Sequence, residues 1–226
     1  MTDFPLAIEV YSDVICPWCY VGKRRLERAL AAAGAREMVR VMWKPFELNP
    51  TMPSQGMDRR TYLEAKFGSL AVFQPMEDRL LAVAEEDGIM FAFDRIARTP
   101  NTLLAHRLLW WADQQGCQDR AVEALFRGYF TEGADIGSVT GLVALAETIG
   151  LVAAELERFL GGTDGVAEVK AEEAAGHRLG IRGVPYFVFN GEYGLSGAQP
   201  VPVFVSALER LSPRGGVDSA GIPERR

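Results

Sequence analysis

Residues 8–27 read IEVYSDVICPWCYVGKRRLE, and this stretch decides how the rest of the chain is interpreted. Phe4–Tyr11 is short and rich in branched residues, which indicates a β-strand. Residues 17–34 place apolar side chains at helical spacing and end on a glycine, which indicates a helix. The cysteine pair Cys16 and Cys19 therefore lies where a strand ends and a helix begins.

This position favours a reactive thiolate at Cys16. The first turn of a helix has unpaired N–H groups and the positive end of the helix dipole, and both stabilise a negative sulfur. Pro17 suits the first helical turn because it lacks an N–H that would go unpaired there. Cys19, three residues later, is placed to attack a mixed disulfide on Cys16 and to release the product. We expect Trp18 to be exposed and to flank a docked peptide.

A zinc site is the alternative interpretation of a close cysteine pair. Structural zinc takes four protein ligands. Besides the pair, the sequence offers only Cys117, His106 and His177, and none of these forms a second close pair. We therefore expect no metal, and three cysteines are too few for a disulfide scaffold.

Other strand patterns lie near the two ends of the chain. Met38–Phe46 alternates as a strand, and the strand–helix–strand order predicts a parallel pair with a right-handed crossover. Pro185–Asn190 is apolar and aromatic, and the Asn-Gly that follows is a strong hairpin signal leading into residues 192–196. A last helix is expected over residues 200–211. Together the two flanks predict a four-stranded mixed sheet.

No strand is predicted between about residues 58 and 180, where the pattern is helical throughout. Asn101 and Ser138 have the residue types of helix N-caps. We expect these helices to form a separate lobe. The predicted organisation is a discontinuous domain of residues 1–50 and 176–212, a helical insertion of residues 51–175, and a flexible tail of residues 213–226 that is rich in Gly, Pro and charge.

Val184 and Pro185 precede the third predicted strand. In thiol oxidoreductases of this architecture a cis X-Pro bond lies beside the cysteine pair, and such bonds are uncommon elsewhere. We expect the Val184–Pro185 bond to be cis, with the N–H and C=O of Val184 free to pair with an extended substrate. The alternative is a proline that only opens an edge strand.

Four segments together resemble the DsbA-like oxidoreductases, most of all their FrnE-type branch: IEVYSDVICPWCYVGKRRLE, NTLLAHRLLWWA, GIRGVPYFVFNG and LSGAQP, in this order. The resemblance covers about residues 7–211. It implies an α/β thioredoxin fold with a large all-helical insertion between its βαβ and ββα halves. It also implies Cys16 as nucleophile, Cys19 as resolving cysteine and Pro185 as the cis-proline.

The same branch is similar to kappa-class glutathione transferases and 2-hydroxychromene-2-carboxylate isomerases. Those enzymes usually have a serine at the position of Cys16, and a Gly-x-Asp-Arg-like stretch that helps to hold glutathione. Here residues 197–200 read Gly-Ala-Gln-Pro, so the acid and the arginine are missing. Gln199 can still hydrogen-bond a carboxylate or amide. We expect no tightly bound cofactor and leave glutathione open as a co-substrate.

Several further residues are candidates for a role in the predicted site. We expect His106 to line the cleft beside the cysteines and to contact substrate, together with Val184 and Gln199. Lys44 and Glu47 are candidates to take a proton from Cys19, the alternative being ordinary surface charge.

The formal net charge is −6 and no basic run is present, so nucleic acid is not an expected partner. The N-terminal segment has no basic residue before Lys23, and no apolar run is long enough to span a bilayer. We therefore expect a cytoplasmic protein with no membrane contact. A homodimer is left open.

Because the cytosol keeps thiols reduced, the sequence predicts a thiol–disulfide reductase or isomerase. Its substrates would be proteins or small molecules that contain a thiol or a disulfide. One alternative is a glutathione-dependent isomerase or transferase acting on an aromatic small molecule. A second alternative is a peptide-binding chaperone that uses the same groove without catalysis.

Overall fold

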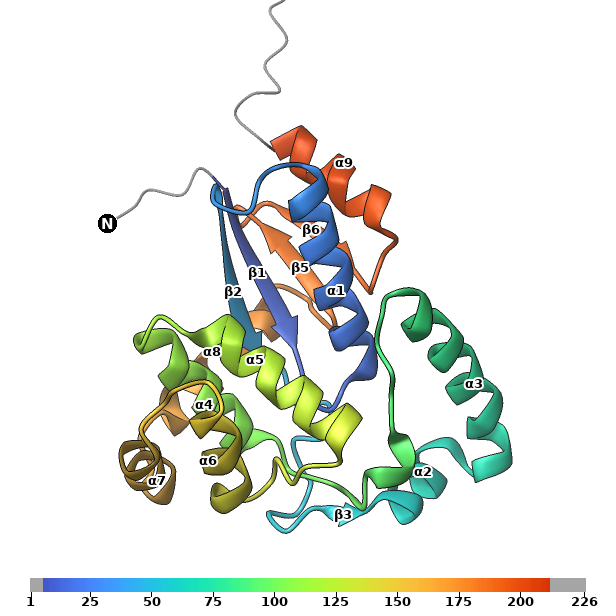
Figure 1. Cartoon of the computed structure of the whole chain (residues 1–226), viewed down its shortest axis with the longest axis vertical. Coiled ribbons are helices and arrows are strands. Elements are labelled where there is room, and N and C mark those ends of the chain that lie inside the picture. The colour runs from blue at the N-terminus through green and yellow to red at the C-terminus, as the bar shows by residue number, and fades with distance from the viewer. Residues whose placement is uncertain (1–5, 212–226) are drawn as a thin grey trace, which may run out of the picture.

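The structure is a computed structural model that describes residues 6–211. The elements appear in the predicted order (Figure 1). Their bounds are β1 Leu6–Ser12, α1 Pro17–Ala32, β2 Val39–Pro45, β3 Met57–Asp58, α2 Arg59–Phe67, α3 Leu70–Glu86, the 3-10 helix η1 Phe93–Arg95, β4 Arg98–Thr99, α4 Leu103–Gln114, α5 Gln118–Arg127, the π-helical turn η2 Gly128–Glu132, α6 Val139–Glu147, α7 Ala153–Gly161, α8 Val166–Arg178, β5 Tyr186–Phe189, β6 Tyr193–Ser196 and α9 Val201–Leu211.

The main sheet has four strands in the order β2-β1-β5-β6, which confirms the predicted mixed sheet. β1 and β2 are parallel and α1 makes the crossover between them, whereas β5 is antiparallel to both β1 and β6. The βαβ and ββα halves therefore meet at the β1–β5 pair, where Ile8 lies opposite Phe189 and Val10 opposite Phe187.

Helices cover both faces of the sheet. On one face α1 and α9 pack over the apolar side chains of β1 and β5, and the rings of Phe187 and Phe204 meet edge to face at 4.8 Å (Figure 1). On the other face α8 lies against Tyr11 of β1. Gly176 permits this approach, because an ideal Cβ at that position would stand 2.5 Å from Cε1 of Tyr11.

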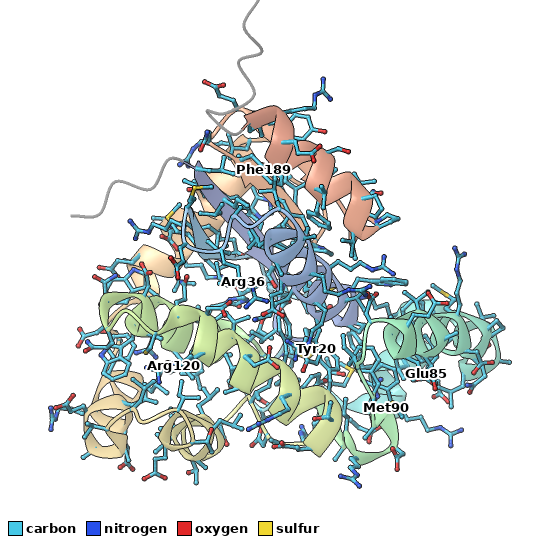
Figure 2. All side chains as sticks on the ribbon, turned by 45° about the horizontal axis from the view of Figure 1, so that its top comes forward. Tyr20, Arg36, Glu85, Met90, Arg120 and Phe189 are labelled. Carbon is cyan, nitrogen blue, oxygen red and sulfur yellow. The ribbon has the colours of Figure 1, made fainter. Side chains whose placement is uncertain are left out.

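The helices of the insertion share a core with the sheet, which corrects the expectation of a separate lobe. One hydrophobic cluster runs from β1 and α1 into α4, α5, α6 and α7. Tyr20 of α1, labelled in Figure 2, shows the connection: its ring stacks on Phe126 of α5 at 5.1 Å, and its hydroxyl donates to Glu123. The expected domain boundary at residues 175/176 falls inside the continuous helix α8.

The insertion is not all helical. β3 and β4 form a short antiparallel pair, Met57 with Thr99 and Asp58 with Arg98, and the Arg98 guanidinium donates to the carbonyl of Gln55. Two-residue strands are too short to show the alternation that a strand prediction needs.

One of the two predicted helix caps is wrong. Ser138 caps α6 by accepting a hydrogen bond from Gly141 N–H. The N-cap position of α4 is Thr102, one residue after the predicted Asn101, and the Thr102 side chain makes no cap hydrogen bond. The Asn101 side chain does accept from Leu103 N–H, the first N–H of the helix, and it donates to the Met52 carbonyl. The predicted tail of residues 213–226 lies outside the described residues. Within residues 6–211 no helix has the length and apolar character needed to cross a membrane.

Candidate functional site

Cys16 is the N-cap residue of α1, and Pro17 is the first residue of that helix. The Cys16 N–H donates to the carbonyl of Asp13, which turns the chain from β1 into α1. No acidic residue lies in the first turn of α1, so the positive end of the helix faces the sulfur without a neutralising carboxylate. The geometry therefore places Cys16 at the positive end of the α1 dipole.

The two thiols differ in access and in ionisation. Both are free, Cys16 is 5% exposed and Cys19 is fully buried. Burial raises the pKa of the Cys19 thiol well above its usual value, and the hydrogen bond and charge of the Cys16 sulfur raise it further. Hydrogen bonds from the Ser12 side chain and the Asp13 backbone oppose this rise in the pKa. Both cysteines are buried, but Cys16 is the more exposed of the two and lines the cavity described below, whereas Cys19 does not line it and keeps its proton to a higher pH.

The Val184–Pro185 peptide bond is cis, as predicted, and it lies beside the cysteines. Cys16 Sγ is 3.7 Å from the carbonyl oxygen of Val184, although the two residues are 168 positions apart in sequence. The Val184 N–H has no hydrogen-bond partner among residues 6–211. A free N–H next to the reactive sulfur is what an extended substrate segment needs for main-chain pairing.

A glycine on α1 lets the proline loop come this close. An ideal Cβ on Gly22 would stand 3.1 Å from Cγ of Pro185 and 3.2 Å from Cζ of Phe187. The Pro185 carbonyl accepts a hydrogen bond from Gly197 N–H, which joins the loop to the residues that follow β6. The loop is therefore held between α1 and the hairpin, on the same side as Cys16.

An apolar cavity of about 260 Å³ opens beside Cys16. Ile15, Pro17 and the half-exposed Trp18 form the wall on the cysteine side. The opposite walls come from α2, α3, η1 and η2 of the insertion. Figure 1 shows α2 near the N-terminal end of α1 and α3 beside α1. Sequence analysis missed these walls, because the helical pattern of α2 and α3 does not indicate which α1 end they approach.

His106 does not line this cavity, which corrects the prediction of a cleft residue. Its side chain is 2% exposed, and its Nε2 lies 3.4 Å from Oδ1 of the fully buried Asp13. Neither of these two atoms has a hydrogen-bond partner among the described residues. Asp13 also accepts from Leu48 N–H at 2.7 Å. Asp13 was not among the residues predicted from the sequence. The one sequence feature that could have indicated it is its position as an acidic residue between a predicted strand and a predicted helix.

The other candidates do not line the cavity, and each is bound by another part of the chain. Lys44 pairs with Glu172, and the buried Glu47 pairs with Lys170, so both are engaged by α8. The Gln199 side chain donates to the Ser196 carbonyl and does not line the cavity. Within residues 6–211 no group of three or more His, Cys, Asp or Glu residues is arranged to hold a metal ion.

Comparison with known proteins agrees with this geometry. The uncharacterized protein YwbO of Bacillus subtilis (strain 168) is 30% identical over 202 residues, which are 89% of this chain and 94% of YwbO. The crystal structure of the probable DsbA oxidoreductase SCO1869 from Streptomyces coelicolor has a TM-score of 0.85 at 36% identity, over 97% of this chain and 94% of that one.

A structure of 2-hydroxychromene-2-carboxylate isomerase has a TM-score of 0.70 at 16% identity, over 92% of this chain and 97% of that one, and so shows a shared fold. Residues 7–209 match the family described as the DSBA-like thioredoxin domain. With its four-stranded sheet, cis-proline loop and helical insertion, the chain belongs to the DSBA-like thioredoxin domain family.

Proposed function

We propose that this protein is a thiol–disulfide oxidoreductase that acts as a reductase or isomerase through Cys16 and Cys19. The observation that supports this most is the position of Cys16 at the unneutralised N-terminus of α1, 3.7 Å from the carbonyl of Val184, with the buried Cys19 three residues away. A structural thiol pair would need neither a free Val184 N–H nor an accessible sulfur beside a cavity.

In the proposed reaction the Cys16 thiolate attacks one sulfur of a substrate disulfide. A Cys16–substrate disulfide forms, and the other substrate sulfur leaves as a thiolate. Cys19 then loses its proton and attacks Cys16 Sγ, which forms the Cys16–Cys19 disulfide and releases the second substrate thiolate. Two electrons pass from the pair to the substrate. The raised pKa of Cys19 supports this order of attack, Cys16 first and Cys19 second, because Cys19 holds its proton while Cys16 reacts.

The proposed role of Pro185 and Val184 is to orient the substrate. A peptide or thiol compound whose backbone pairs with Val184 would bring its sulfur next to Cys16. Pro185 presents no N–H at this point, and the exposed Trp18 lines the cavity together with Cys16. The net direction depends on the reduction potential. We propose reduction in the cytosol, with a thiol such as glutathione returning the cysteines to the reduced state.

A Cys19→Ala variant tests this proposal. Incubated with glutathione disulfide or with oxidised insulin, it should accumulate a mixed disulfide on Cys16, because no second thiol remains to resolve it. Intact-protein mass spectrometry and peptide mapping measure this. Cys117→Ala is the matched control, because Cys117 is buried and remote in sequence from the pair, and it should keep wild-type turnover. Turnover that survives Cys16→Ala would refute the proposal.

A glutathione-dependent isomerase or transferase for an aromatic small molecule is the second candidate. The apolar cavity beside Cys16 favours it. Such an enzyme needs one activated sulfur and no resolving thiol. Turnover of a glutathione-dependent reaction that is unchanged in Cys19→Ala would therefore select this alternative over the first.

A further inference from the structure

Arg59, the first residue of α2, lines the cavity beside Cys16 and has no hydrogen-bond partner for its guanidinium within residues 6–211. Its side chain is 16% exposed, and the carboxylate of Glu77 is 3.8 Å away, beyond hydrogen-bond distance. The guanidinium carbon lies 5.1 Å over the ring of Phe93, a contact with the face of the ring that leaves the N–H donors free.

Two other arginines with low exposure donate several hydrogen bonds each. Arg107 is 3% exposed, and its guanidinium donates to four backbone carbonyls near the end of α7. Arg25, with its side chain 14% exposed, donates to Asp87 and to the Ala198 carbonyl. Arg59 has Glu77 as an ion-pair partner at 3.8 Å, but no acceptor among residues 6–211 takes a hydrogen bond from its guanidinium. These free N–H donors point to an acceptor anion that enters the cavity from outside.

Glu77 is the one carboxylate among the described residues that line this cavity. Burial raises the pKa of Glu77, and the charge of Arg59 only partly opposes this rise. Lys66 adds a second cation at the edge of the same cavity, where its ammonium donates to the Tyr62 hydroxyl. The polar part of this cavity is thus positive.

The remaining walls are largely apolar and partly aromatic, including Phe67, Phe73 and Phe130. The volume of about 260 Å³ compares with roughly 150 Å³ for an engineered apolar cavity that binds benzene. There is space for one substituted aromatic ring or an aliphatic group of similar size. A folded peptide segment would not fit.

We propose that this cavity binds the apolar ring of a small organic disulfide that carries a carboxylate, with the carboxylate on Arg59 and a sulfur at Cys16. This inference rests on the thiol–disulfide exchange proposed above and names its substrate class. The disulfide R–S–S–R reacts with the two protein thiols to give two R–SH molecules and the Cys16–Cys19 disulfide, so that sulfur atoms, protons and electrons balance. A cytosolic thiol then reduces the pair.

Two aromatic disulfides that differ in charge make the test. Dithiobis-nitrobenzoate carries a carboxylate on each ring, and dithiodipyridine is neutral. Arg59→Met should lower the second-order rate constant of the reduced enzyme with dithiobis-nitrobenzoate by about tenfold, which corresponds to about 1.4 kcal/mol. Its rate with dithiodipyridine should change less than about twofold on the same scale. Arg59→Lys should recover part of the loss.

Arg60→Met is the matched control. Arg60 is the next residue of the same helix, its side chain is 74% exposed and it pairs with Glu64 outside the cavity. It should leave both rate constants unchanged. An equal loss with both disulfides in Arg59→Met, or no loss with either, would overturn the inference. So would a tenfold loss of insulin reduction in Arg59→Met, because the arginine would then serve a peptide.

The stoichiometry separates this inference from the proposed function. Wild-type enzyme should release two aromatic thiolates per molecule, and Cys19→Ala one. Release of one thiolate by wild type refutes the exchange mechanism itself. Release of two, at a rate that Arg59→Met does not alter, refutes only the carboxylate site.

Discussion

Asp87 provides a sharp test of how the insertion is held to the sheet domain. It is the C-cap residue of α3, and its carboxylate lies 2.6 Å from Nε of Arg25 and 2.7 Å from a terminal nitrogen of Arg28, both on α1. α3 has 17 residues but fully buries only Leu80 and Ala84. Its C-terminal end therefore depends on this ion pair, and we predict that Asp87→Ala loosens the helix.

The magnitude follows from the burial of each partner. The Asp87 side chain is 3% exposed and that of Arg25 is 14% exposed, so this charged hydrogen bond contributes about 1.5–3 kcal/mol. The Arg28 side chain is 56% exposed, so its pair contributes at most about 1 kcal/mol. The sum is about 2–4 kcal/mol. For a chain of this size about 3 kcal/mol lowers the melting temperature by roughly 6–12 °C.

Thermal melts and hydrogen exchange followed by mass spectrometry measure the effect. Amides of α3 should exchange roughly 30- to 700-fold faster in Asp87→Ala if the helix opens locally. Glu64→Ala is the control, because it removes an i,i+4 pair with side chains 74% and 44% exposed, and it should cost less than about 0.5 kcal/mol. If Asp87→Ala is no more destabilising than Glu64→Ala, the reasoning is wrong.

Two further predictions concern a titration and a close contact. The pKa of Cys19 is raised above its usual 9.0 by burial, so the folded reduced protein keeps a proton that the unfolded chain releases. The contribution of this group to the free energy of unfolding is then fully present below about pH 9, and above that pH it falls by up to about 1.4 kcal/mol per pH unit. Thermal melts of the reduced protein up to about pH 10 should show this fall in wild type and not in Cys19→Ala. If the two proteins lose stability in parallel as the pH rises, the prediction is contradicted. Tyrosines whose pKa is raised to about 12 add losses of stability only at higher pH. Gly176→Ala should cost about 1–3 kcal/mol in urea unfolding, because its Cβ would meet the Tyr11 ring at 2.5 Å. Gly161→Ala, also in a helix but with no atom within 4 Å, should be neutral or stabilising, and equal effects would refute the packing argument.

Local patterns in the sequence determined most of the fold and the centre of the site. The strand-to-helix junction at Cys16 and the hairpin at Asn190-Gly191 each depend on residues within a few positions of one another. The cis bond before Pro185 was predicted only in combination with the distant cysteine pair. The order of strands and helices follows from periodicity in short windows. The pairing of the two halves followed from the resemblance of four segments to one family.

Only the tertiary structure decided the surroundings of the cysteines. The contact of His106 with Asp13, the approach of α2 to the N-terminal end of α1 and the contact of Arg59 with Glu77 join residues from different elements. A periodic pattern states which face of a helix is buried, but it does not state which partner buries it. Charges and cavities at such contacts arise from packing between elements, and no short window of sequence records them.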